Sequence, residues 1–407
     1  ASPVTLKAEK DGAVKVIGGG TFAVVSQTDT KIVYQSTGGS CSVQGSLEQD
    51  GLLKFDIAFP EAIDADRVFL DIPVKKEIAT LYHAIGEYVR ANPAGFIPPG
   101  TGRVFNSRSI SQIHVSNFIP YIWVGSDERG ICYAADWDKG WIHSAKYDAV
   151  ELHRNQQGDV IIRLNLLNGP IPPKPGRVIT LALMASPVKP MPEGWRGWSD
   201  SFDAKSTRLT KCLQSPPYWG AFQDWAQRYP TWEDFEYVRK LKSAKDTGVI
   251  DYGFIEQWLE KLGQADKSDV PWLAAMDKEN ARVFARNHIN AGFAFAQSLH
   301  NHPNANLYYY TCDTENLANL PEFPAYADEW SALSGVAGSF QDYAIYYLDK
   351  MLENGMEGVY NDNTFFRCCD AWATGNAYID DEGNVKPSFC LWESREYRRR
   401  ELNIILN

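Results

Sequence analysis

Hydrophobic and polar residues alternate in short runs along the first half of the chain. Residues 53–59 place apolar side chains at every second position, and the same period of two recurs at 68–72 and 162–166. Such alternation is typical of strands that bury one face. Clusters rich in Gly, Pro and Asn separate the runs at intervals that suit a sandwich. The pattern predicts an antiparallel β-sandwich domain over residues 1–185.

A proline-rich linker at 186–198 precedes a change of period. Apolar residues then follow helical spacing at 341–354, Gly355 ends that helix, and a short apolar strand follows at 358–360. Alternating helices and strands after an all-β half predict a (β/α) TIM-type barrel as the catalytic domain over residues 199–407. Further helices are expected at 232–244, 254–262, 278–300 and 391–405, and a buried strand at 306–312.

The predicted barrel is expected to be incomplete in this chain. A (β/α)₈ domain needs roughly 250 residues and eight strands, whereas the second half offers only a few strand candidates. The sequence stops at Asn407 directly after the last predicted helix. We therefore expect a chain truncated at its C-terminus, or later strands supplied by a second chain or a missing segment.

Composition narrows the class of protein. The chain has 407 residues, of which 44% are hydrophobic and 22% charged, enough for large buried cores and more than one domain. The formal net charge of -11 and the lack of a dense Lys/Arg run argue against nucleic acid and favour a neutral or cationic ligand. No apolar run is long enough to span a membrane.

The location is expected to be secreted or periplasmic. The first residues lack a basic and apolar leader, as in a mature secreted protein whose signal peptide has been removed, although a cut chain would begin in the same way. The 13 Trp, 20 Tyr and 19 Phe residues raise the expectation of a carbohydrate ligand, because sugar rings stack on aromatic faces. A large aromatic core is the alternative explanation.

Carboxylates form the candidate catalytic group. Asp362 directly follows the strand at 358–360, where active-site residues of barrels lie, and Asp328 with Glu329 form an adjacent acidic pair. Glycoside hydrolysis needs two carboxyl groups, one of them kept protonated. We expect Glu329 to act as general acid and Asp362 as nucleophile. The alternatives are an Asx-turn at Asp362 and an exposed helix N-terminus at 328–329.

Aromatic and acidic residues near these carboxylates are the expected sugar contacts, although Asp313 and Asp370 also suit a cap or turn. Trp137 and Trp141 in the sandwich are expected to close one side of the cleft. No metal site or cofactor is expected, because the chain has no H-E-x-x-H motif, no C-x-x-C pair and no dinucleotide fingerprint. The predicted substrate-binding residues are Tyr310, Asp313, Trp330, Tyr360, Asp370 and Trp219.

Several segments resemble a family of large secreted bacterial proteins classed as glycoside-hydrolase-like and largely uncharacterised. That family is similar in layout to the exo-β-N-acetylgalactosaminidases. The resemblance rests on the segments 118–125, 127–130, 138–141, 328–330, 358–362, 378–383 and 395–397.

The resemblance implies a glycosidase, with substrate-assisted cleavage of an N-acetylhexosamine as one mechanism. In that mechanism Asp328 orients the acetamido group and Glu329 donates the proton. Asp362 is then either the nucleophile or the orienting carboxylate. A non-catalytic carbohydrate-binding protein on the same scaffold is the alternative, because a fold does not fix an activity. A polysaccharide lyase would need a Tyr, His or Lys base beside an Arg, and the sequence alone displays no such cluster.

Overall fold

The computed structural model describes most of the first 188 residues and selected parts of the remainder. The described residues are 4–18, 22–38, 41–86, 92–110, 117–188, 236, 239–240, 243, 247, 284–287, 309–310, 332–333, 338–353, 358–361 and 377–406. The chain divides into two compact units, which are described separately. The first comprises Ala1–Met191, Phe366–Cys368 and Tyr378–Leu391, and the second comprises Pro192–Phe365, Cys369–Ala377 and Trp392–Asn407.

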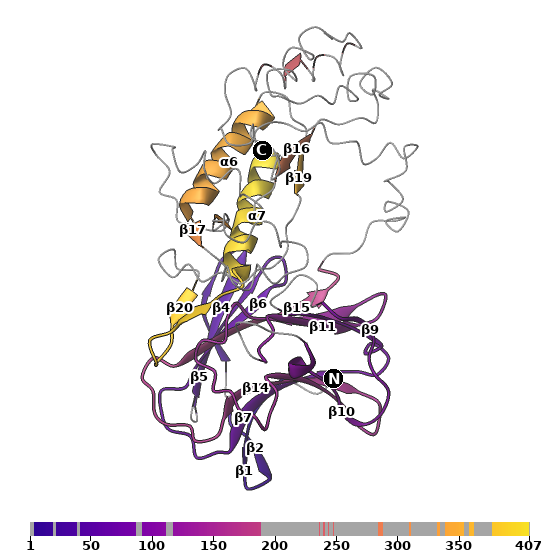
Figure 1. Cartoon of the computed structure of the whole chain (residues 1–407), viewed down its shortest axis with the longest axis vertical. Coiled ribbons are helices and arrows are strands. Elements are labelled where there is room, and N and C mark those ends of the chain that lie inside the picture. Colours follow the sequence, from indigo (N-terminus) through magenta and orange to yellow (C-terminus); the bar gives the residue numbers. More distant parts are fainter. Residues whose placement is uncertain are drawn as a thin grey trace, which may run out of the picture. The chain divides into compact units, whose positions relative to one another are not determined.

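Two antiparallel sheets form the first unit (Figure 1). The six-stranded sheet has the order β10-β13-β14-β7-β1-β2, with β1 Thr5–Lys10, β2 Ala13–Val16, β7 Arg67–Val74, β10 Gly102–Asn106, β13 Val150–Arg154 and β14 Val160–Asn168. The nine-stranded sheet has the order β3-β4-β5-β6-β15-β12-β11-β8-β9. Its strands are β3 Phe22–Gln27, β4 Lys31–Gly38, β5 Cys41–Glu48, β6 Leu53–Ala58, β8 Leu81–Ile85, β9 Ala94–Phe96, β11 Tyr121–Gly125, β12 Gly130–Ala134 and β15 Val178–Ser186.

The core lies between the sheets and follows the period of two. On β7, Val68, Leu70 and Ile72 are buried, while Arg67 and Asp71 point to the opposite face and form ion pairs there. The strands predicted at 53–59, 68–72 and 162–166 are confirmed as β6, β7 and β14. Alternation predicted them because apolar side chains recur on the face toward the core, although Phe69 and Asp71 on the other face of β7 are buried as well.

A distant segment joins this unit after an interval of almost two hundred residues. The strands β20 (Ala377–Ile379) and β21 (Val385–Pro387) form a hairpin whose turn is closed by a hydrogen bond from the Asp380 N–H to the Asn384 carbonyl, at 2.9 Å. Lys174 binds Asp381 at 2.6 Å, so the hairpin is tied to the sandwich.

The residues after the hairpin also pack on the sandwich. The backbone N–H of Leu391 donates to the Asp136 carboxylate, and that of Phe389 donates to the Asp136 carbonyl at 2.7 Å. The ring of Phe389 lies 6.2 Å from that of Phe118, centre to centre, and both residues are fully buried. Residues 378–391 therefore complete the core of the first unit.

The described elements of the second unit include a parallel and an antiparallel strand pair. β16 (Phe284–Asn287) pairs parallel with β19 (Gly358–Asn361), and β17 (Tyr309–Tyr310) pairs antiparallel with β18 (Ala332–Leu333). The helices α6 (Gly338–Glu353) and α7 (Leu391–Leu406) confirm two predicted helices. Arg400 of α7 binds Asp342 of α6 at 2.7 Å.

The predicted TIM-type barrel is wrong. Of the described residues 47% lie in strands and only 16% in helices, and they do not show the ring of helices that surrounds a barrel. The antiparallel pair β17–β18 has no place in an all-parallel ring. Phe284–Asn287 forms a strand inside the predicted helix 278–300, which is a second correction. In the described parts of the chain, none of the helices combines the length and apolar character needed to cross a membrane.

Candidate functional site

The predicted catalytic residues lie outside the part of the chain that the structure describes. Tyr310 lies in β17 and Tyr360 in β19. The remaining predicted site residues, which are Asp328, Glu329, Asp362, Asp313, Trp330, Asp370 and Trp219, lie outside the described residues. Their roles therefore stay predictions.

A polar cluster in the first unit centres on the carboxylate of Asp138. Oδ2 lies 2.8 Å from Nε2 of His143, and Oδ1 accepts a hydrogen bond of 2.7 Å from the hydroxyl of Tyr378. The side chain of Asp138 is only 12% exposed. Asp138 and His143 lie in the loop that follows β12, while Tyr378 comes from β20, 240 positions later. The returning hairpin therefore completes this cluster.

The loop has a defined local conformation. The backbone N–H of Trp141 donates to the Asp138 carbonyl at 3.0 Å. Ile142 forms an isolated β-bridge with Leu167 of β14. Gly140 between them has φ +88°, and a Cβ there would lie 2.6 Å from the carbonyl oxygen of Val178. Only glycine fits both conditions, because L side chains rarely adopt this conformation. The short segment 138–143 thus holds its carboxylate and imidazole in one arrangement.

Aromatic rings surround the polar cluster. The rings of Trp137 and Tyr378 meet edge to face, with centres 5.7 Å apart and planes at 77°. Nζ of Lys139 lies 5.1 Å from the centre of the Trp137 ring and 5.9 Å from that of Tyr378. Trp141 is buried and contacts the rings of Phe118 and His143. Of the two tryptophans predicted to close a cleft, Trp137 is therefore the half-buried one and Trp141 belongs to the interior.

The protonation states of the cluster follow from burial and hydrogen bonding. Burial alone would raise the pKa of Asp138. The hydrogen bond and charge of His143, together with the hydrogen bond from the Tyr378 hydroxyl, outweigh burial and hold this pKa below its usual value. Burial, together with the nearby Asp138 charge, raises the pKa of Tyr378 far above its usual value. At neutral pH Asp138 is therefore an ionised acceptor and Tyr378 a protonated donor.

Three buried polar atoms near Asp138 make no hydrogen bond with any described residue. They are Nδ1 of His143, the hydroxyl of Tyr133 and Nε1 of Trp141. Tyr133 is fully buried, and the charge of Asp138 contributes to the raised pKa of its phenol. Buried polar groups usually find a partner. These atoms offer hydrogen-bonding capacity to a water molecule or a ligand group.

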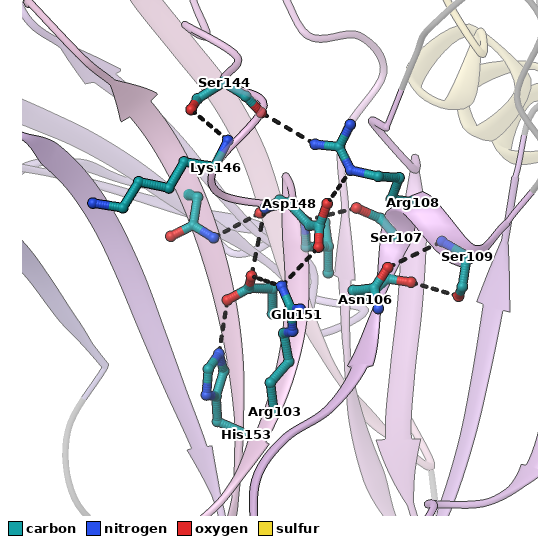
Figure 2. A network of polar contacts seen from close by, with 12 residues as sticks. Arg103, Asn106, Ser107, Arg108, Ser109, Ser144, Lys146, Asp148, Glu151 and His153 are labelled. Carbon is teal, nitrogen blue, oxygen red and sulfur yellow. Dashed lines mark hydrogen bonds and ion pairs between the residues drawn. The ribbon is translucent and has the colours of Figure 1, made fainter.

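Figure 2 shows a second polar network, which joins β10 and β13 of the six-stranded sheet to the short 3-10 turn Ser107–Ser109 and to the loop before β13. The Asp148 carboxylate accepts hydrogen bonds from the guanidinium groups of Arg103, at 3.0 Å, and Arg108, at 2.6 Å. The Glu151 carboxylate accepts a hydrogen bond of 3.3 Å from the guanidinium group of Arg103, and its Oε2 lies 2.7 Å from Nε2 of His153. Both acids are buried, whereas the side chains of Arg103 and Arg108 are each 48% exposed. We interpret this network as structural, because loss of an arginine would leave a buried carboxylate without its compensating charge.

These buried acids predict the pH dependence of stability. For Asp138, Asp71 and Glu151 burial opposes ionisation, but cationic and hydrogen-bonding partners hold each pKa below its usual value. An acid with a lowered folded-state pKa stabilises the fold above its unfolded pKa, about 4, and loses that contribution as the pH falls through the folded value.

The unfolding free energy of the first unit should therefore be flat between neutral pH and about pH 5 and fall below about pH 4. Urea titrations followed by circular dichroism at several pH values measure it. An Asp138→Asn variant should show a shallower fall, because its side chain does not titrate. An unfolding free energy that stays constant or rises on acidification would contradict this account.

The sequence patterns missed this cluster for two reasons. A spacing of five between Asp138 and His143 matches no known catalytic or metal motif, so the histidine carried no signal of its own. Tyr378 meets Asp138 only through the long-range return of the hairpin. The one available signal was that 138–141 and 378–383 both belong to the segments that carry the family resemblance.

Comparison of the chain with models of known protein families and with curated proteins finds no match of either kind.

Proposed function

We propose that the protein binds a glycan at an aromatic platform, defined as Trp137 and Tyr378 with the adjoining Lys139 and Asp138. One observation carries this proposal: the hydrogen bond between Asp138 and Tyr378 joins two segments that each resemble the glycoside-hydrolase-like family. Residues from distant parts of the sequence thereby share one surface of the first unit.

The chemistry of the platform suits a sugar. A pyranose presents a flat C–H face that packs on an indole ring, and its hydroxyl groups require both donors and acceptors. Trp137 provides a half-buried ring and Lys139 an exposed donor, while the Asp138 carboxylate, only 12% exposed, holds the hydroxyl of Tyr378. The fixed edge-to-face contact between Trp137 and Tyr378 orients the rings before a ligand arrives, which reduces the ordering cost of binding.

We further propose that the protein hydrolyses a glycan at the carboxylates predicted from the sequence. Glu329 would protonate the leaving oxygen. Asp362 would act either as nucleophile or, with Asp328, as the carboxylate that orients the acetamido group of an N-acetylhexosamine. Support for this step comes from the residue types and from the family resemblance. The alternative is a glycan-binding protein without turnover.

One set of variants tests both parts of the proposal. Trp137→Ala should weaken glycan binding about tenfold to hundredfold in isothermal titration calorimetry, because the stacking surface is lost. Glu329→Gln and Asp362→Asn should retain binding and lose about a hundredfold or more of turnover, as expected for an acid and a nucleophile. Turnover is measured by the release of reducing ends from an oligosaccharide panel.

Matched controls come from exposed positions away from the platform. Phe96 is 80% exposed on β9, so Phe96→Ala should leave binding unchanged. Asp29 is exposed in the turn before β4, and Asp29→Asn should leave turnover unchanged. Binding without turnover in the unaltered protein would favour the non-catalytic alternative. Equal binding by the Trp137→Ala and Phe96→Ala variants would contradict the platform.

A further inference from the structure

Lys139 differs in its environment from the other lysines around the platform. Lys174 is paired with Asp381 at 2.6 Å, and Lys386 lies 3.7 Å from Asp380. Among the residues that the structure describes, no carboxylate forms an ion pair with Lys139. Its ammonium group instead lies over the Trp137 and Tyr378 rings. A cation held over aromatic rings keeps its charge available to a further anion.

The acids near the platform already have partners, with one exception. Asp138 is bound by His143 and Tyr378, and the Asp380 carboxylate accepts hydrogen bonds from the backbone N–H groups of Glu382 and Asn384. The exception is Glu382, which is exposed at the tip of the hairpin turn. Lys139 is therefore the platform's exposed positive charge. Asp138, Asp380 and Asp381 act electrostatically on the Tyr378 hydroxyl, and Glu382 is a further exposed acid on the hairpin that carries Tyr378.

The acidic net charge of the whole chain does not exclude an anionic ligand at Lys139. A net charge of -11 disfavours the approach of an anion at long range. At physiological ionic strength, however, charges separated by more than about 8 Å are largely screened. A carboxylate or sulfate in direct contact with Lys139 experiences the ammonium group far more strongly than the distant acids. A charge-assisted hydrogen bond of this kind is about twice as strong as a neutral one.

We infer that the aromatic platform selects an anionic glycan, in which a carboxylate or sulfate group on the stacked sugar pairs with Lys139. The inference rests on the proposed glycan-binding function and specifies its ligand class. The sugar ring packs against Trp137, and its acidic group forms an ion pair with the Lys139 ammonium group, which otherwise lies over the rings of Trp137 and Tyr378. Uronic acids and sulfate esters share this chemistry, and the experiment separates them.

The test measures the affinity of the whole protein for paired oligosaccharides by isothermal titration calorimetry. Oligogalacturonates are compared with their neutral methyl esters, and neutral galactan oligosaccharides with their sulfate esters. At least one acidic form should bind about tenfold more tightly than its neutral counterpart, and that preference should shrink as salt is added. The pair that shows the preference identifies the acidic group.

Variants assign the preference to one side chain. Lys139→Gln should remove both the preference and its salt dependence, whereas Lys139→Arg should keep both. Lys76 is exposed in the turn that follows β7, and Lys76→Gln is the matched control that should change neither. Glu382→Gln should strengthen the binding of the acidic form, because it removes a repulsive charge.

The outcomes separate this inference from the proposed function. If acidic and neutral forms bind equally and Trp137→Ala abolishes both, the platform binds glycans without selecting anions, and only the inference fails. An anionic preference that survives Lys139→Gln also overturns it. If none of the four oligosaccharide classes binds, the proposed function and the inference both fail.

Discussion

Replacement of Asp138 by alanine should lower the unfolding free energy of the first unit by about 3 kcal/mol. The loss leaves the Tyr378 hydroxyl and Nε2 of His143 without their common acceptor, in a site where Asp138 itself is only 12% exposed. Uncompensated buried donors carry the full cost of their desolvation. Urea titrations followed by circular dichroism measure the change, which is a large part of the 5–15 kcal/mol typical of a domain.

The control for this variant is Asp29→Ala, an exposed aspartate in the same unit, which should change stability by no more than about 0.5 kcal/mol. Asp138→Asn should fall between the two, because an amide oxygen can still accept one of the hydrogen bonds. If Asp138→Ala and Asp29→Ala proved equally mild, the cluster would not stabilise the fold as its geometry implies.

Truncation of Phe389 should be about as damaging, with an expected loss of about 3–5 kcal/mol. Its ring is 1% exposed and lies against Phe118, so alanine would leave a cavity in the core of the first unit. This result would be informative because Phe389 is far from the sandwich in sequence. The same urea titrations, read on the strand signal, measure the loss.

Phe96→Ala is the matched control, since Phe96 is 80% exposed on the edge strand β9. It should leave the unfolding transition of the sheets within about 0.5 kcal/mol of the unaltered protein. A Phe389→Ala variant whose sheets unfold as in the unaltered protein would show that residues 378–391 do not complete the core.

The strands of the first unit were predictable because apolar side chains recur at every second position where one face of a strand lines the core. β6, β7 and β14 appear where apolar residues alternate, and α6 and α7 where they follow helical spacing. Periodicity identifies an element but not its partners. The alternation of helix and strand therefore predicted a barrel, whereas β17 and β18 pair antiparallel.

The Asp138 cluster shows the same limit at the level of a site. The segments containing Asp138 and Tyr378 were both noted for their resemblance, yet nothing local indicated that the two side chains meet. Their contact depends on the hairpin's attachment through Lys174 and Asp136, which is a long-range property of the fold. The position of the Tyr133 hydroxyl near Asp138 was likewise unpredictable, since alternation identifies Tyr133 only as a core residue.

The central claim is that residues far apart in sequence form one energetically coupled site at Asp138 and Tyr378. A double-mutant cycle with Asp138→Asn and Tyr378→Phe, measured by urea titration of the unfolding free energy, tests it most directly. The account predicts a coupling energy of about 1–2 kcal/mol, as expected for residues in one hydrogen-bonded network. Strictly additive effects of the two substitutions would contradict it.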